Sequence, residues 1–139
     1  MTNYKIKILK RLIIVSTLTI VLYFVISVGF YFISSRDVNT AVFEGFVFDK
    51  VTLKPISNST IVILSERYES DLGQSNYDEF LGNDTIHLRS NTQGHYIGHI
   101  KKSAYFTIQI FKENYDPIIT KGYYTRKRNH LNFYLKKRR

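Results

Sequence analysis

The chain has 139 residues, no cysteine and a formal net charge of +9, with 11 tyrosines and 10 phenylalanines. This length allows one small globular domain with an appendage, and a cysteine-free chain excludes disulfide bonds and thiolate metal sites. The charge is unevenly placed, because residues 1–36 carry five basic and no acidic side chains, whereas residues 38–139 carry 15 basic and 10 acidic ones.

The first element expected along the chain is a membrane-spanning helix. Residues 12–33 form a run of 22 uncharged, mostly apolar residues, and a helix of this length would span about 33 Å, close to the roughly 30 Å of a hydrocarbon core. A cleaved signal peptide would have a shorter apolar core and a small-residue cleavage site, which Asn39-Thr40-Ala41 does not provide. A buried helix of a soluble protein would normally show a polar face. We therefore predict a basic tail over residues 1–11 and a single-pass transmembrane helix over residues 12–34.

The charges around this span predict its orientation. Four basic residues precede it, while Arg36 and Asp37 nearly cancel after it. The positive-inside bias then keeps the amino terminus cytoplasmic and places the carboxy-terminal domain outside, on the periplasmic side of the cytoplasmic (inner) membrane. The basic carboxy-terminal portion argues the other way, but long domains translocate largely regardless of charge.

Beyond a linker over residues 35–41, short apolar runs separated by turn residues predict an all-β domain over residues 42–139. The first two strands are expected to be neighbours, joined by the loop Lys50–Asn58, in which Pro55 marks the turn. Seven strands are expected in an antiparallel sandwich, namely Val42–Asp49, Ser59–Glu66, Thr85–Ser90, Gly94–Ile100, Ala104–Phe111, Pro117–Thr120 and Leu131–Lys136.

Two-residue alternation predicts which side chains of this domain face the core. In the fifth run Phe106, Ile108 and Ile110 fall on one face. The last run repeats the pattern, with apolar positions at Leu131, Phe133 and Leu135.

Several short motifs resemble the carboxypeptidase regulatory-like domains. Residues 45–49 (GFVFD), 54–56 (KPI) and 60–64 (TIVIL) resemble the opening of that family's pattern, and residues 90–97 (SNTQGHYI) and 105–115 (YFTIQIFKENY) resemble its later turn and closing corner. The resemblance implies a transthyretin-like or Ig-like β-sandwich of seven strands. Such domains are generally non-catalytic appendages, so no catalytic residues transfer.

The chain departs from the family's pattern at two places. Asn114 stands where a glycine is common, although asparagine tolerates the left-handed backbone region. The segment Arg67–Asn83 is a long, polar, insertion-like loop rich in acidic residues. We interpret it as a solvated connection that carries features particular to this protein.

The histidines do not predict a metal site. His95 and His99 lie four residues apart on one predicted strand, about 13 Å from each other, and His87 on the neighbouring predicted strand would give two ligands at most. Neither a calcium-loop pattern nor a serine-nucleophile elbow is present in the sequence. We therefore expect no catalytic residue, cofactor or metal.

Basic and aromatic residues mark a candidate interaction surface. A predicted hairpin over Lys121–Arg128 and the segment Lys136–Arg139 are basic, and both suit anionic lipid, an acidic polymer or plain solvation. Nucleic acid would require a cytoplasmic domain, against the predicted orientation. Together with the polar loop, the surface comprises Tyr68, Asp71, Tyr77, Asp78, Lys121, Tyr123, Tyr124, Arg126, Lys127 and Arg128.

These features lead to a functional prediction. The chain is expected to be a non-catalytic, membrane-anchored binding or structural module of the cell envelope, with a protein or an envelope polymer as partner. The alternative is an accessory subunit of a larger membrane enzyme or envelope-assembly complex. A basic adaptor that faces the cytoplasm is a third hypothesis.

Overall fold

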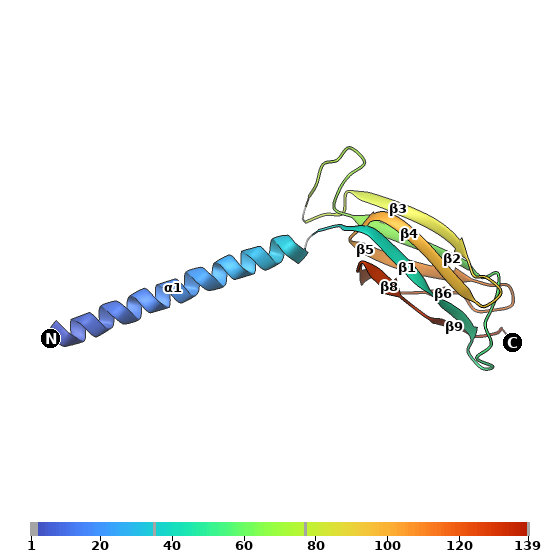
Figure 1. Cartoon of the computed structure of the whole chain (residues 1–139), viewed down its shortest axis with the longest axis horizontal. Coiled ribbons are helices and arrows are strands. Elements are labelled where there is room, and N and C mark those ends of the chain that lie inside the picture. Colours follow the sequence, from blue (N-terminus) through green and yellow to red (C-terminus); the bar gives the residue numbers. More distant parts are fainter. Residues whose placement is uncertain (1–2, 35, 77, 139) are drawn as a thin grey trace. The chain divides into compact units, whose positions relative to one another are not determined.

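The computed structural model describes residues 3–34, 36–76 and 78–138. The chain divides into two compact units, residues 1–35 and residues 36–139 (Figure 1). The first unit is one long helix, and the second is a domain of β-strands.

The helix α1 runs over Asn3–Ser34 and is 32 residues long. It begins within the predicted basic tail, because lysine and arginine are good helix formers. Its segment Ile6–Tyr31 is long and apolar enough to cross a membrane. As expected for polar residues in such a helix, the hydroxyl groups of Thr17 and Thr19 each donate a 2.9 Å hydrogen bond to the carbonyl four residues earlier.

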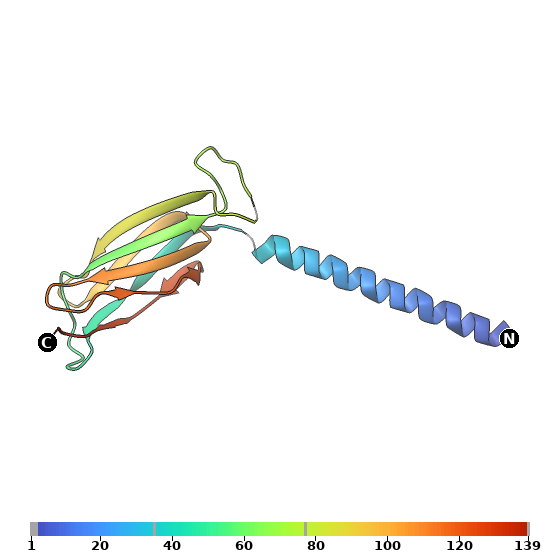
Figure 2. The ribbon, with the colours of Figure 1, turned by 180° about the vertical axis from the view of Figure 1, so that it is seen from behind.

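The second unit contains two sheets. In the first, β1 lies between β4 on one side and β8 and β9 on the other; in the second, the order is β3–β2–β5–β6, and β7 also pairs with β5 (Figures 1 and 2). The nine strands are β1 (Val38–Asp49), β2 (Thr60–Arg67), β3 (Gly82–Arg89), β4 (His95–Ser103), β5 (Tyr105–Phe111), β6 (Ile118–Ile119), β7 (Tyr123–Tyr124), β8 (Arg128–His130) and β9 (Phe133–Leu135).

The predicted all-β architecture is confirmed, but two details of it are wrong. Nine strands instead of seven lie in the described residues, and β1 runs parallel to β8 and β9, so the sandwich is not purely antiparallel. The two additional strands, β7 and β8, are only two and three residues long. They were missed because such short runs carry no measurable alternation.

The predicted pairing of the first two strands is also wrong. β1 belongs to one sheet and β2 to the other, so the loop Lys50–Asn58 carries the chain across the core. Within this loop Pro55 forms an isolated bridge with Phe48, and Ile56 is buried between the sheets. Burial of Ile56 favours the crossing over a hairpin, since a hairpin would leave this side chain in solvent. β1 also begins four residues before the expected strand, because Val38 pairs with Ser103 of β4.

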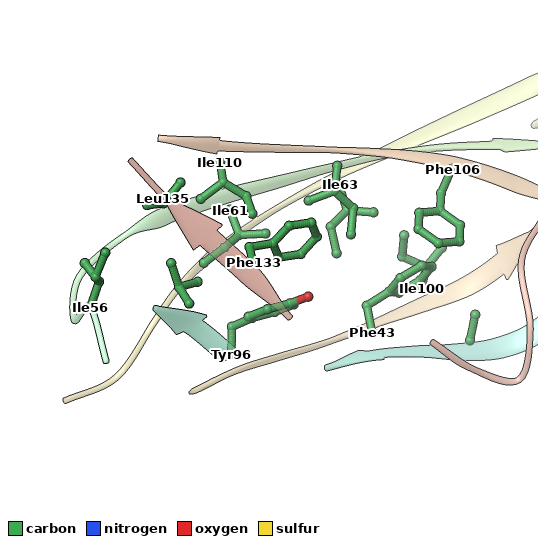
Figure 3. Close-up of a cluster of buried hydrophobic side chains, with 13 residues drawn as sticks. Phe43, Ile56, Ile61, Ile63, Tyr96, Ile100, Phe106, Ile110, Phe133 and Leu135 are labelled. Atoms are coloured by element: carbon green, nitrogen blue, oxygen red, sulfur yellow. The ribbon is translucent and has the colours of Figure 1, made fainter. Parts of the chain in front are cut away.

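The core lies between the two sheets (Figure 3). Phe106, Ile108 and Ile110 are buried as the alternation predicts, and Phe106 packs edge-on against Phe43 of β1 with ring centroids 4.8 Å apart. In the last predicted strand, burial is confirmed for Phe133 and Leu135, whereas Leu131 is only half-buried.

A partly buried hydrogen bond passes over β1 and joins β4 to the segment between β8 and β9 in the same sheet. The hydroxyl of Tyr96 donates a 2.8 Å bond to the carbonyl of Leu131, which lies directly above Gly45. Burial raises the pKa of the Tyr96 phenol far above its usual range, so it remains a donor. A side chain at Gly45 would meet the Leu131 carbonyl at 1.8 Å, which explains glycine in the middle of a central strand.

Candidate interaction surfaces

Arg67 fixes the base of the polar loop 68–81. The residue is 8% exposed, and its guanidinium donates hydrogen bonds to the carboxylates of Asp71 and Asp84 and to the carbonyl of Glu69. The hydrogen bond to Asp71 raises the pKa of the guanidinium. The loop is therefore anchored at its base, while residues 71–75 and 78–81 are exposed to solvent.

The residue before β1 also holds this loop. The carboxylate of Asp37 accepts hydrogen bonds from the backbone N–H groups of Tyr68 (2.8 Å) and Glu69 (3.1 Å). The side chain of Glu69 in turn pairs with Lys102, and this hydrogen bond lowers the pKa of the glutamate. The loop thus lies at the end of the sandwich where β1 begins, which we call the proximal end.

The structure places three of the four predicted loop residues. The ring of Tyr68 is half-buried, 4.9 Å from that of Phe80. Asp71 is exposed and forms an ion pair with Arg67. The backbone N–H of Asp78 donates a 3.0 Å hydrogen bond to Oδ1 of Asn76 within the loop. Tyr77 lies outside the described residues.

The basic segment 121–128 is not the predicted hairpin. Tyr123 and Tyr124 pair with β5, and Arg128 then begins a strand that pairs with β1, so the segment crosses from one sheet to the other. The crossing is held by Asn129, which is 7% exposed. Its amide accepts a hydrogen bond from the Arg126 N–H and donates to the carbonyls of Val42 and Arg126.

The predicted basic residues in this segment differ in their contacts. Lys127 donates a 2.7 Å hydrogen bond to the carbonyl of Asn39, and Arg128 lies 3.7 Å from the carboxylate of Glu44. Lys121 and Arg126 are exposed, and their side chains have no ion pair among the described residues. A cleft of about 390 Å³ is bordered by Tyr123, Tyr124 and Arg126.

The structure brings the polar loop and the basic segment to the same end of the sandwich. Tyr105, at the start of β5, lies between them, with its ring 5.9 Å from Phe80 and 5.4 Å from Tyr124. Residues 68–81 carry four acidic and no basic side chains, and residues 121–128 carry four basic and no acidic ones. The formal charges of the two segments therefore cancel at the proximal end.

At the opposite end, where β1 ends, only the basic carboxy-terminal segment 136–139 was singled out from the sequence. We call this end the distal end. Three segments meet there, namely residues 50–58, 112–117 and 136–138, and hydrogen bonds link each to another: Tyr115 to Asp49, Lys112 to Ser57, and the N–H of Arg138 to the Asn114 carbonyl. The carboxy-terminal basic residues are consequently part of the folded domain and not a free tail, as far as residue 138.

Asp49 organises the first of these segments. Its carboxylate accepts hydrogen bonds from the N–H groups of Val51 (2.9 Å) and Thr52 (2.8 Å) and from the Tyr115 hydroxyl (3.0 Å). The backbone bond from Thr52, followed by that from Val51, lowers the Asp49 pKa to about 2. An aspartate at a strand end, followed by a turn, is a recognisable sequence signal for such hydrogen bonds.

A cleft at the distal end has a volume of about 620 Å³. The aromatic ring of Phe111 and the half-buried Tyr115 line it. Its charged and amide-bearing lining residues are Asn58, Lys112, Glu113, Asn114 and Arg138.

The histidines are dispersed over the two sheets. His87 lies on β3, in the sheet opposite to that of His95 and His99 on β4. Within residues 3–34, 36–76 and 78–138, no group of three or more His, Cys, Asp or Glu side chains could hold a metal ion.

Comparison with solved structures supports the sandwich fold. The chain is similar to 3-chlorocatechol 1,2-dioxygenase from Rhodococcus opacus 1CP, with a TM-score of 0.51 and 13% identity over 73% of this chain. It spans 62% of that dioxygenase. Likeness at this identity concerns the fold alone.

Two further structures have lower scores. Hydroxyquinol 1,2-dioxygenase from Pseudomonas putida DLL-E4 gives a TM-score of 0.48 at 12% identity, over 73% of this chain and 58% of the enzyme. The C-terminal domain of the shaft pilin SpaA from Lactobacillus rhamnosus GG gives 0.47 at 10% identity, over 72% of this chain and 99% of that domain. No protein-family model matches the sequence, and no curated protein matches it.

Proposed function

We propose that this chain is a single-pass membrane protein whose β-sandwich domain serves as a non-catalytic binding module outside the cytoplasmic membrane. The observation that carries the proposal is the division of the chain into two unlike units. One is an apolar helix whose segment Ile6–Tyr31 could cross a membrane, and the other is a sandwich with its own closed core.

The helix is suited to lipid because its apolar side chains surround it. Leu18, Phe24 and Phe30 are each at least 64% exposed, and a helix that is apolar on all sides needs an apolar environment. At about 1.5 Å per residue, the 26-residue segment spans about 39 Å, enough to cross the bilayer with some tilt.

The domain belongs, in this proposal, to the carboxypeptidase regulatory-like type of transthyretin-like sandwich. Three features support the assignment. Asn114 adopts a left-handed backbone with φ of +64°, as expected at a position where glycine is common. Gly94, in the turn motif, has φ of +73°. Asp49 ends β1 and holds the following turn.

Release from membranes tests the anchor. Replacement of Val21 and Leu22, near the middle of the span, by arginine adds two charges where each costs about 3 kcal/mol. The unmodified chain should remain in the membrane pellet at alkaline pH with the mass of the full sequence, and the double variant should move to the supernatant. A shorter chain with a new amino terminus after the span would instead show a cleaved signal sequence and contradict the proposal.

The accessory-subunit hypothesis is the second candidate. It is favoured by the unpaired outer edges of β3 and β4, which pair on one side each in the described part of the sandwich, because such edges can accept a strand from a partner. An accessory subunit should co-purify in mild detergent with a stoichiometric protein partner, and a proline at Thr85 on β3 should abolish that association. A chain that purifies alone and still binds its ligand would contradict this candidate.

A further inference from the structure

We propose that the distal end of the sandwich binds a linear polyanion, meaning a flexible polymer that carries a phosphate or carboxylate group on each repeat. This inference rests on the proposed binding module and names its ligand class. The surface consists of the segments 50–58, 112–117 and 136–138 and the 620 Å³ cleft beside them.

Charge distinguishes this end from the other. The three distal segments carry six basic side chains, Lys50, Lys54, Lys112, Lys136, Lys137 and Arg138, against two acidic ones, Glu113 and Asp116. Six minus two leaves +4, whereas the polar loop and the basic segment at the proximal end cancel. The excess positive charge of the domain is thus concentrated at the distal end, where it attracts anions.

The distal charges are held on a fixed scaffold. The N–H of Lys50 donates a 2.8 Å hydrogen bond to the Leu135 carbonyl, and the N–H of Asp116 donates a 2.9 Å bond to the Lys136 carbonyl. Tyr115 and Lys137 form an isolated bridge beside them. Binding an anion here costs little backbone ordering, since these hydrogen bonds already fix the three segments.

The acidic residues nearby do not neutralise this surface. Asp49 is 8% exposed, and its carboxylate oxygens already accept hydrogen bonds from backbone N–H groups and from the Tyr115 hydroxyl. Asp116 lies 3.6 Å from Arg138, but that arginine side chain is still 61% exposed. Lys112 uses one donor on the Ser57 carbonyl and keeps two for a ligand.

The composition of the surface favours a polymer over a single small anion. Five of its six basic residues are lysines, which act as mobile point charges and tolerate varied geometry, unlike the planar fork of arginine. The charges also span three segments instead of converging on one point. A flexible chain with an anionic group on each repeat can contact basic side chains on all three segments. The side-chain amides of Asn58 and Asn114 line the cleft and can add hydrogen bonds.

Binding of defined polyanions to the full chain in a neutral detergent tests the proposal. Fluorescein-labelled polyphosphate and poly-L-glutamate, followed by anisotropy, serve as the phosphate and carboxylate probes, and neutral dextran is the uncharged control. Binding should weaken steeply between about 50 and 200 mM salt, because each contact releases counterions. The tighter of the two probes identifies the anionic group.

Two variant pairs with the same loss of charge locate the site. Lys136→Gln with Lys137→Gln should weaken polyanion binding by about tenfold and lower the salt slope by about 2. Lys112→Gln with Arg138→Gln, which removes two charges at the cleft, should weaken polyanion binding and lower the salt slope by the same amounts. The matched control, Lys121→Gln with Arg126→Gln at the proximal end, should change affinity less than about twofold.

Two results would overturn this inference. One is absence of binding to both polyanions at low salt, and the other is an equal loss in the proximal control, which would show a response to net charge alone. Neither result bears on the anchor, since membrane extraction is measured separately. Failure of the ligand assignment is therefore distinguishable from failure of the proposed function.

Discussion

The Tyr115 hydroxyl donates a 3.0 Å hydrogen bond to Oδ2 of Asp49 and so joins the loop after β5 to the end of β1. The other oxygen of Asp49 binds the N–H groups of Val51 and Thr52. The hydrogen bond to Asp49 raises the pKa of the Tyr115 phenol, so the hydroxyl stays protonated and remains a donor at neutral pH.

The Asp49 interactions predict a specific dependence of stability on pH. Its pKa is lowered from 3.8 to about 2 in the folded chain, so the ionised form is favoured by folding. The resulting stability is present above pH about 4 and is lost as the pH falls toward 2. Asp49→Asn should therefore be less stable than the parent at pH 7 and should show a flatter decline between these values.

Thermal melts of the full chain in detergent, followed by circular dichroism from pH 7 to about 2, measure this difference. Glu113→Gln is a suitable control, because it removes one carboxylate at an exposed position of the same end of the domain. Parallel pH profiles for the parent and Asp49→Asn would contradict the assigned role of Asp49.

A methyl group at Gly45 should disrupt the core. Its carbon would lie 1.8 Å from the Leu131 carbonyl, so Gly45→Ala should cost about 3 kcal/mol of unfolding free energy through overpacking. Tyr96→Phe should cost about 1 kcal/mol, since it leaves the Leu131 carbonyl without its donor. Urea denaturation measures both, and Gly29→Ala, which meets nothing within 4 Å, is the matched control. A neutral Gly45→Ala would show that the Leu131 carbonyl does not lie against β1 at this point.

Removal of the Arg67 guanidinium should loosen the polar loop. Arg67→Met keeps the aliphatic stem but removes the hydrogen bonds to Asp71, Asp84 and the Glu69 carbonyl, at a cost of about 2 kcal/mol. Limited proteolysis should then cut within residues 68–81 at least several times faster. Arg126→Met, at an exposed position of the basic segment, should leave the cleavage rate unchanged. Equal cleavage of the parent and Arg67→Met would contradict the anchoring role.

Substitutions at Asn114 test the backbone conformation of the turn at the distal end. Its φ of +64° is left-handed, so Asn114→Ala should cost about 1 kcal/mol, whereas Asn114→Gly should be nearly neutral. Chemical denaturation of the two variants gives the comparison directly. If alanine were tolerated as well as glycine, the turn would have to adopt another conformation.

Much of the fold could be predicted where the pattern is long. The charge-free run 12–33 predicted an apolar helix, and the alternation at Phe106, Ile108 and Ile110 predicted their burial, because both signals repeat over several turns or residues. β7 and β8 could not be predicted as strands, because two or three residues cannot show alternation. The parallel pairing of β1 with β8 and β9 joins residues far apart in sequence, which no local pattern reports.

The candidate surfaces show the same limit. The sequence grouped residues by charge along the chain, so the basic segment 121–128 and the acidic loop were recognised, but not their meeting at the proximal end. The distal surface needed the structure, because the sequence marks the basic segment 136–139 but not that residues 50–58 and 112–117 lie beside it. Asn129, which holds the crossing near Arg126, gave no signal, since an asparagine among basic residues reads as an ordinary turn.

The location of the domain is the measurement that tests the central claim most directly. The chain has no cysteine, so single thiols report without background. Ser75→Cys, at an exposed position of the polar loop, and Tyr4→Cys, at the start of the helix, would be probed in intact cells with a membrane-impermeant maleimide.

We predict that Cys introduced at position 75 is labelled before lysis and that Cys introduced at position 4 is labelled only afterwards. This result would place the domain outside the membrane, with the amino terminus inside. Labelling of position 4 with protection of position 75 would reverse the orientation. Protection of both until lysis, together with release of the chain at alkaline pH, would contradict the membrane anchor itself.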